Sequence, residues 1–192
     1  MSINLNKYPS KIALASSSPR RRELLQSLGF ELTLLDPNID ESQRPDETPE
    51  NLVLRLAVEK AQAVAHLTDL PIMAADTVVV VEGVILGKPH DIHHARDMIL
   101  QLSGKEHLVL TGYALSYQNR LVNNLAQTTI TFRDLCDYEV DNYLQTGQWA
   151  GKAGACTLQG ASGPFVNNIN GSLANVLGLP LNEVLAALQK VA

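Results

Sequence analysis

The sequence predicts a mixed α/β fold in which buried strands alternate with amphipathic helices. An apolar run at 12–15 ends in three serines and a proline and continues into a leucine-striped segment, as expected for a strand followed by a capped helix. A second run, 71–81, is almost continuously apolar, which is typical of a strand covered on both faces. Two long strand-like runs, 107–117 and 121–132, are separated by a short polar spacer and predict a β-hairpin.

The composition indicates one globular domain, residues 1–192, and excludes several classes of function. Hydrophobic residues make up 45% of the chain and charged residues 18%, as in water-soluble proteins. A net charge of -5 argues against a broad surface for nucleic acid or an anionic membrane, and no apolar run is long enough to span one. Cys136 and Cys156 lack metal or redox spacing and the N-terminus lacks a signal core, so we expect a cytoplasmic protein.

The turn after the first strand is the first candidate site. Ser18 and Pro19 suit the N-cap and first position of a helix, and Gly29 suits its left-handed end. A helix start presents unpaired N–H groups and positive dipole charge, yet three arginines, 20–22, follow where acids are usually favoured. We therefore predict an oxyanion site, with phosphate as the ligand. The alternative is an ordinary capped helix with solvated arginines.

A polar loop and a second helix follow. Strand 30–35 leads into loop 38–47, which is crowded with carboxylates, among them Glu41, and with turn-forming residues. Functional side chains concentrate on loops of this kind. A second cap-and-proline start at Thr48 begins a helix that we expect to reach Ala65.

One acid interrupts the most apolar strand. Asp76 is flanked by alanines and valines, and a carboxylate there is costly to bury unless a cation, a metal or a ligand's protons meet it. We therefore predict a functional role for Asp76, the alternative being a strand-end cap. Single cations occur along the chain at Arg55, Lys60, Lys88 and Lys152. Arg55 is also spaced to pair with Glu59 on its own helix, so a purely structural reading of these charges stays open.

Three other patterns give weaker evidence for a functional site. The segment from Gly83 to Lys88 is one spacer residue short of a phosphate-binding P-loop, and Pro89 replaces its Ser/Thr. Three histidines at 90–94 lack further ligands at metal spacing and are interpreted as solvated residues at a helix start. The glycine-rich stretch 151–171 predicts either loops that approach a ligand closely or a plain connection before the last helix, which begins at Pro180.

Together these residues suit the positioning of a polyphosphate, the binding of a divalent ion and the activation of a water molecule. A covalent mechanism is not supported, because the turn serines lack a basic partner nearby in sequence and Cys156 has no evident imidazole. Direct hydrolysis at phosphorus is predicted.

Seven segments resemble the Maf family of nucleoside triphosphate pyrophosphatases, in the same order and over nearly the whole chain. They are Leu14–Leu25, Arg55–Ala61, Ala75–Val79, Gly87–Pro89, Gly151–Gly154, Leu158–Gly160 and Gly178–Pro180. The opening serine-proline-arginine signature and the Ala-Asp-Thr strand are highly specific as a pair. The resemblance implies a Maf/inosine-triphosphatase-like fold, an α/β protein whose long twisted mixed sheet divides two lobes around a nucleotide cleft.

The family's reaction, as the resemblance implies, converts a nucleoside triphosphate and water into the monophosphate and pyrophosphate with Mg²⁺ or Mn²⁺. Asp76 matches the proton acceptor, expected to activate water for attack at the α-phosphorus and also to bind the ion. Glu41 matches a nearby acidic position and is the second metal-ligand candidate. The positions expected to bind the triphosphate are Ser16, Arg21, Lys60, Lys88 and Lys152.

Three further positions match the branch of the family that acts on dTTP and UTP: Arg20, Thr77 and Gln159. The branch that acts on 7-methyl-GTP has tryptophan, glutamine and glutamate there. The amide of Gln159 offers a donor and an acceptor, which suits the mixed edge of uracil or thymine. Two departures lie near the expected base pocket: Cys156-Thr157 replaces a frequent tyrosine-glycine, and Leu173-Ala174 replaces an aromatic-containing pair.

The resemblance therefore predicts a dTTP and UTP pyrophosphatase. Two alternatives stay open: a pyrophosphatase for non-standard purine or 7-methylguanosine triphosphates that uses the same cleft, and a non-catalytic, nucleotide-binding regulator of cell division. The expected partner is the nucleotide itself, without nucleic acid or membrane. The sequence is compatible with a homodimer.

Overall fold

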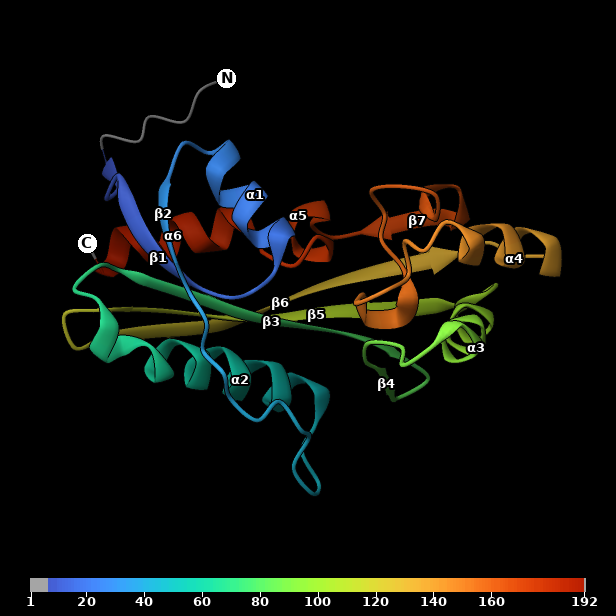
Figure 1. The fold of residues 1–192 in the computed structure, drawn as a ribbon, viewed down its shortest axis with the longest axis horizontal. Helices are drawn as coiled ribbons and strands as arrows, with labels where there is room; N and C mark the ends of the chain where they lie inside the picture. Colours follow the sequence, from blue (N-terminus) through green and yellow to red (C-terminus); the bar gives the residue numbers. More distant parts are fainter. Residues whose placement is uncertain (1–6, 192) are drawn as a thin grey trace. The chain divides into compact units, whose positions relative to one another are not determined.

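The computed structural model describes residues 7–191, which form a mixed sheet of seven strands with helices packed on it (Figure 1). The strands are β1 (Lys11–Ala15), β2 (Glu31–Leu35), β3 (Ile72–Val81), β4 (Val84–Leu86), β5 (Glu106–Tyr117), β6 (Arg120–Phe132) and β7 (Val166–Asn170). Their order is β2-β1-β3-β5-β6-β7, and β4 pairs with β3. β1 runs parallel to β2 and β3, whereas the β3–β4 and β6–β7 pairs are antiparallel. The predicted α/β class is confirmed.

The helices include two that begin at the capping residues that the sequence indicates, Ser18 and Thr48. The helices are α1 (Pro19–Ser27), α2 (Pro49–Ala63), α3 (Ile92–Leu102), α4 (Asp137–Gln145), α5 (Leu173–Val176) and α6 (Leu181–Val191), with 3₁₀ turns η2 (Ala65–Leu67), η3 (Ala153–Ala155) and η4 (Gly163–Phe165). The hydroxyl of Ser18 accepts a hydrogen bond from the N–H of Arg21, and that of Thr48 accepts one from Asn51. α2 ends two residues earlier than expected and is followed by η2. None of the helices among residues 7–191 combines the length and the apolar character needed to cross a membrane.

The chain divides into two compact units, and β3, β5 and β6 each continue from one unit into the other. The first unit contains the residues up to Asp76, then 111–126 and the residues from Gly178 onward. The second unit contains 77–110 and 127–177. Each unit has its own buried apolar residues.

In the first unit the strands carry different side chains on their two faces. Ile12 and Leu14 of β1 belong to an apolar cluster with residues of α1 and α6, while the alternate residues Ala13 and Ala15 belong to a second cluster with α2. Figure 1 shows α2 on the face of the sheet opposite α1 and α6. β3 alternates in the same way, with Ala74 in the α2 cluster. Asp76, two residues further along β3, therefore points to the α2 face.

α2 lies close to the sheet because the residues between them are small. Ala57 and Ala61 of α2 pack against alanines of β1 and β3, and all are fully buried. Gly112 of β5 has no space for a side chain, because a Cβ there would collide with the backbone of Val53 in α2. This close approach sets how far a side chain of α2 must reach to contact the sheet.

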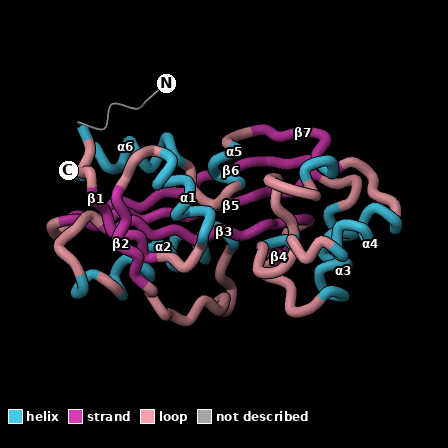
Figure 2. Tube along the Cα trace, turned by 45° about the horizontal axis from the view of Figure 1, so that its top comes forward, coloured by secondary structure: helices cyan, strands magenta, loops and turns pink. Residues whose placement is uncertain are grey.

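The second unit is built around aromatic side chains and an edge strand. Phe165 packs edge-to-face on Phe132 and Tyr143, within a core formed with α3 and α4. β7 lies beside β6 (Figure 2). This strand was not predicted from the sequence, because its residues, Val-Asn-Asn-Ile-Asn, are mostly polar. The long hairpin of β5 and β6 turns at Gln118 and Asn119, whose φ values of 46° and 64° suit a tight hairpin turn.

Candidate active site

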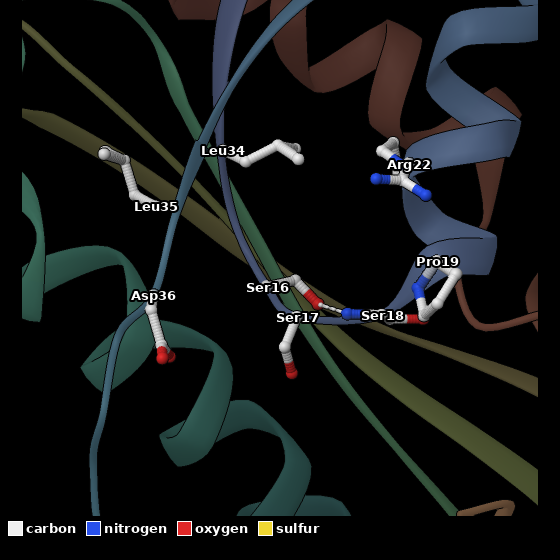
Figure 3. A pocket seen from close by; sticks show the side chains of 8 residues that line it. All are labelled: Ser16, Ser17, Ser18, Pro19, Arg22, Leu34, Leu35 and Asp36. Carbon is white, nitrogen blue, oxygen red and sulfur yellow. Dashed lines mark hydrogen bonds between the residues drawn. The ribbon is translucent and has the colours of Figure 1, made fainter.

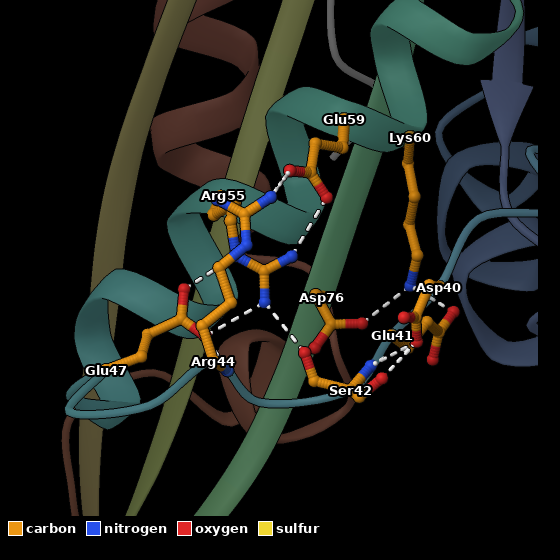
Figure 4. A network of polar contacts seen from close by, with 9 residues as sticks. All are labelled: Asp40, Glu41, Ser42, Arg44, Glu47, Arg55, Glu59, Lys60 and Asp76. Carbon is orange, nitrogen blue, oxygen red and sulfur yellow. Dashed lines mark hydrogen bonds and ion pairs between the residues drawn. The ribbon is translucent and has the colours of Figure 1, made fainter.

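Three residues that the sequence singled out meet on the α2 face of the first unit. The Lys60 Nζ lies 2.6 Å from Asp76 Oδ1 and 2.7 Å from Glu41 Oε1, so one ammonium bridges two carboxylates (Figure 4). The side chains of Lys60 and Asp76 are only 6% and 12% exposed, whereas that of Glu41 is 48% exposed. Asp76 lies inside β3 and is not a strand-end cap. The cation that a buried acid requires is supplied by α2.

The signature turn contributes a second cation. The Arg21 side chain is buried; its Nε donates to the carbonyl of Gly178 at 2.8 Å and its Nη1 donates to the Ser16 hydroxyl at 3.2 Å. Burial lowers the pKa of Arg21, and the negative charges of Asp76 and Glu41 oppose that shift. The predicted residues Ser16 and Arg21 are therefore in direct contact, in the same unit as the two carboxylates.

A hollow of about 240 Å³ opens beside this turn (Figure 3). It is lined by Ser16, Ser17, Ser18, Pro19, Arg22, Leu34, Leu35 and Asp36. Arg22 lines this hollow, and the predicted Arg21 does not. The sequence could not tell these neighbouring arginines apart, because their directions depend on how α1 packs. Ligand pockets commonly have volumes of roughly 300–1,000 Å³, so the hollow is smaller than a typical ligand pocket.

The remaining predicted site residues, apart from Arg20, belong to the second unit. The segments of Lys88 and Lys152 are joined there, because the N–H of Gly154 donates to the carbonyl of Gly87 at 3.0 Å. Lys88 is exposed, and Thr77 and Lys152 are half-buried. Arg20 is half-buried in the first turn of α1. The roles of these residues toward a nucleotide stay predictions.

Gln159 sits in a turn that a buried hydroxyl closes. Ser162 Oγ accepts from the N–H of Thr157 at 3.1 Å and donates to the carbonyl of Thr157 at 2.6 Å. The side-chain oxygen of Gln148 accepts from the N–H of Ala161 at 2.9 Å. Gln159 is exposed at the turn. The sequence did not identify Ser162, because its contact pairs two residues within a glycine-rich loop without a regular pattern.

The donor set fits a divalent ion that is shared with a phosphate. Within residues 7–191 no group of three or more His, Cys, Asp or Glu side chains is arranged to hold a metal. Glu41 and Asp76 supply two carboxylates on one ammonium. Mg²⁺ in phosphoryl-transfer sites is usually bound by one or two carboxylates, with phosphate oxygens and waters as the other ligands. These two carboxylates are the groups that would bind such an ion.

Comparison with known proteins identifies the family. The sequence profile of the Maf family, described as Maf-like protein, matches residues 11–191. This chain belongs to the Maf family. It is 44% identical over 176 residues to a dTTP/UTP pyrophosphatase of Shigella dysenteriae serotype 1, covering 91% of this chain and 89% of that protein. It is 46% identical over 172 residues to a dTTP/UTP pyrophosphatase of Salmonella typhimurium, covering 88% and 87%.

One solved structure supports the fold. A HAM1 protein from Coxiella burnetii aligns with a TM-score of 0.51 and 16% identity, covering 92% of this chain and 98% of that one. At this identity the likeness concerns the fold alone. The family membership predicted from the signature turn and the Ala-Asp-Thr strand is confirmed.

Proposed function

We propose that this Maf-family chain hydrolyses dTTP and UTP to the nucleoside monophosphate and pyrophosphate. The observation that carries the proposal is the buried Asp76 held 2.6 Å from Lys60, with Glu41 on the same ammonium and Arg21 among the surrounding charges. The activity named for two relatives, which are 44% and 46% identical to this chain over the aligned residues, supports the substrate class.

In the proposed reaction, Asp76 takes a proton from a water molecule that attacks the α-phosphorus. The bond between the α-phosphorus and the bridging oxygen breaks, and pyrophosphate leaves with that oxygen. One oxygen of Asp76 is held by Lys60, which keeps the carboxylate oriented. When bound, Mg²⁺ or Mn²⁺ supplies Lewis-acid stabilisation of the charge that develops on the phosphate oxygens.

The other predicted residues take positioning roles in this proposal. Ser16, Arg21, Lys88 and Lys152 bind phosphate oxygens. Lys60 offsets the charge of Asp76 and Glu41 and contacts the triphosphate. In the transition state these cations mainly stabilise the negative charge that develops on the leaving pyrophosphate. Arg20, Thr77 and Gln159 select the pyrimidine.

Release of pyrophosphate from a nucleotide panel tests the proposal. Purified protein with Mg²⁺ or Mn²⁺ should turn over dTTP and UTP in preference to dCTP, ITP and 7-methyl-GTP. Asp76→Asn should lower kcat at least a hundredfold, the usual contribution of a general base, with the circular dichroism spectrum unchanged. Asp97→Asn, at an exposed position of α3, is the matched control. An undiminished Asp76→Asn enzyme, a preference for purines, or binding without turnover would contradict the proposal.

A further inference from the structure

The loop that carries Glu41 has no regular secondary structure of its own. It joins β2 to α2 and spans residues 36–48. The side chain of Glu41 is half exposed, so burial alone does not hold it against Lys60. Contacts elsewhere in the loop must set its conformation, because an unrestrained loop of this length would populate many conformations.

Arg55 of α2 makes the contacts that hold this loop (Figure 4). Its Nε and Nη2 donate to the two carboxylate oxygens of Glu47 at 2.6 and 2.8 Å. Its Nη2 also donates to the carbonyl of Ser42 at 3.0 Å, and its Nη1 donates to Glu59 at 2.9 Å. The guanidinium therefore joins α2 to two points of the loop, and one of them, Ser42, directly follows Glu41.

The acceptors of Arg55 are themselves held in place. Glu47 also accepts from the N–H of Arg44 at 3.0 Å, and Glu59 accepts from the Arg44 side chain at 2.8 Å. The hydrogen bonds from Arg55 lower the pKa of Glu47 to about 2, so this carboxylate stays ionised at neutral pH. The side chains of Arg55 and Glu47 are 13% and 8% exposed, which protects their contact from solvent screening.

This geometry goes beyond the helical ion pair that the sequence spacing indicates. The pair with Glu59, four residues away, accounts for one of the four hydrogen bonds. The other three connect residues 8 and 13 positions apart, outside the helix. They require a planar donor fork, which a lysine ammonium cannot provide.

We propose that Arg55 is a positioning residue for the active site: it holds loop 36–48 so that Glu41 stays beside Lys60 and Asp76. Its effect on metal and catalysis rests on the proposed function, whereas its effect on the loop does not. Loss of a group that orients a metal ligand typically costs 10–100-fold in metal affinity or activity. Arg55 itself touches neither the nucleotide nor the ion.

The test compares Arg55→Met and Arg55→Lys with a matched arginine in the second unit. Arg133 donates to both oxygens of Glu139 at 2.5 and 3.0 Å and to the carbonyl of Pro164 at 3.0 Å. Its hydrogen bonds likewise lower the pKa of Glu139 to about 2. Arg133→Met therefore removes similar contacts without touching loop 36–48. Glu47→Gln removes the charge of the loop carboxylate that Arg55 contacts and serves as a second variant if Arg55→Met folds poorly.

Two readouts are measured on each variant, together with its melting temperature. The first is amide hydrogen exchange of residues 38–47, which needs no nucleotide or metal. The second is the Mn²⁺ concentration that gives half-maximal pyrophosphate release, with kcat and KM determined separately. We expect Arg55→Met and Glu47→Gln to speed exchange in 38–47 and to raise the half-saturating Mn²⁺ concentration about tenfold or more, with partial recovery in Arg55→Lys. Arg133→Met should change neither.

The outcomes separate the two proposals. Unchanged exchange in Arg55→Met and Glu47→Gln overturns the role of Arg55, and so does a tenfold rise in Mn²⁺ requirement in Arg133→Met. Faster exchange without any change in Mn²⁺ requirement reduces Arg55 to a structural residue and also overturns the proposal. If the wild-type protein hydrolyses no nucleotide, the proposed function fails, and hydrogen exchange still decides whether Arg55 holds the loop.

Discussion

Replacing Lys60 with methionine should destabilise the first unit and make its stability depend on divalent ions. Methionine preserves most of the length and apolar stem of lysine but removes the ammonium that bridges Asp76 and Glu41. Removing one partner of a buried ion pair typically costs about 3–5 kcal/mol, because the other charge stays behind without compensation. Arg21 retains part of the attraction for both carboxylates, so we expect the lower end, about 3 kcal/mol.

Thermal unfolding checks this magnitude. In a chain of this size 1 kcal/mol corresponds to roughly 2–4 °C, so in EDTA the midpoint of Lys60→Met should fall by roughly 6–12 °C. Addition of Mn²⁺ should recover much of the loss, because the ion can then bind between the two carboxylates and binds only the folded state. The wild-type midpoint should respond less, since without a nucleotide the ammonium already offsets the charge of the two carboxylates.

Lys105 provides the matched control for Lys60. Its Nζ lies 2.8 Å from Glu82 in an exposed ion pair, which is worth at most about 1 kcal/mol. Lys105→Met should therefore shift the midpoint only slightly, and Mn²⁺ should not affect it. The reasoning would be refuted if Lys60→Met and the wild type had the same unfolding midpoint in EDTA, or if Mn²⁺ did not raise the midpoint of Lys60→Met.

Two further predictions concern the second unit. Burial lowers the pKa of His107 from 6.5 to about 4. Below pH 6.5 the unfolded state therefore takes up a proton that the folded state does not. The free energy of unfolding should fall by up to about 3 kcal/mol as the pH drops from 6.5 to 4. Urea unfolding followed by the fluorescence of Trp149 should show this slope, and His107→Phe should flatten it; an equal slope in both proteins would contradict the assignment. Ser162→Ala should loosen the turn that carries Gln159, because both hydrogen bonds between the Ser162 hydroxyl and Thr157 are lost. We expect the preference for UTP over CTP, measured as a ratio of kcat/KM, to fall by roughly tenfold. An unchanged ratio would separate this turn from base selection.

The parts of the site that follow from local chemistry could be predicted from sequence. Ser18 and Thr48 cap their helices as their hydroxyls and the following prolines indicate. Asp76 could be identified because a charge within an apolar strand needs a partner, and the strand period of two places it on one face of the sheet. Lys60 emerged as that partner only in the structure, because the sequence offers several cations at unknown distances.

Non-local contacts explain what could not be predicted. The hydrogen bonds from Arg55 to Glu47 and Ser42 join a helix to an irregular loop, so no periodic pattern in the sequence predicts them. The sequence indicated only the pair with Glu59, four residues away. That pair is present, but it accounts for one of the four hydrogen bonds that Arg55 donates. The choice between Arg21 and Arg22 likewise depends on how α1 packs on the sheet, which helix propensity alone does not determine.

The glycine and alanines under α2 have a consequence for engineering this enzyme. Gly112 and Ala57 let the helix backbone approach the strands until no room remains for a larger group. A substitution such as Gly112→Ala would move α2 away from the sheet. The ammonium of Lys60 would then have to reach further to Asp76, or the ion pair would break. The thickness of one interior layer, set by residues that take no part in the ion pairs, thus determines whether Lys60 can reach Asp76.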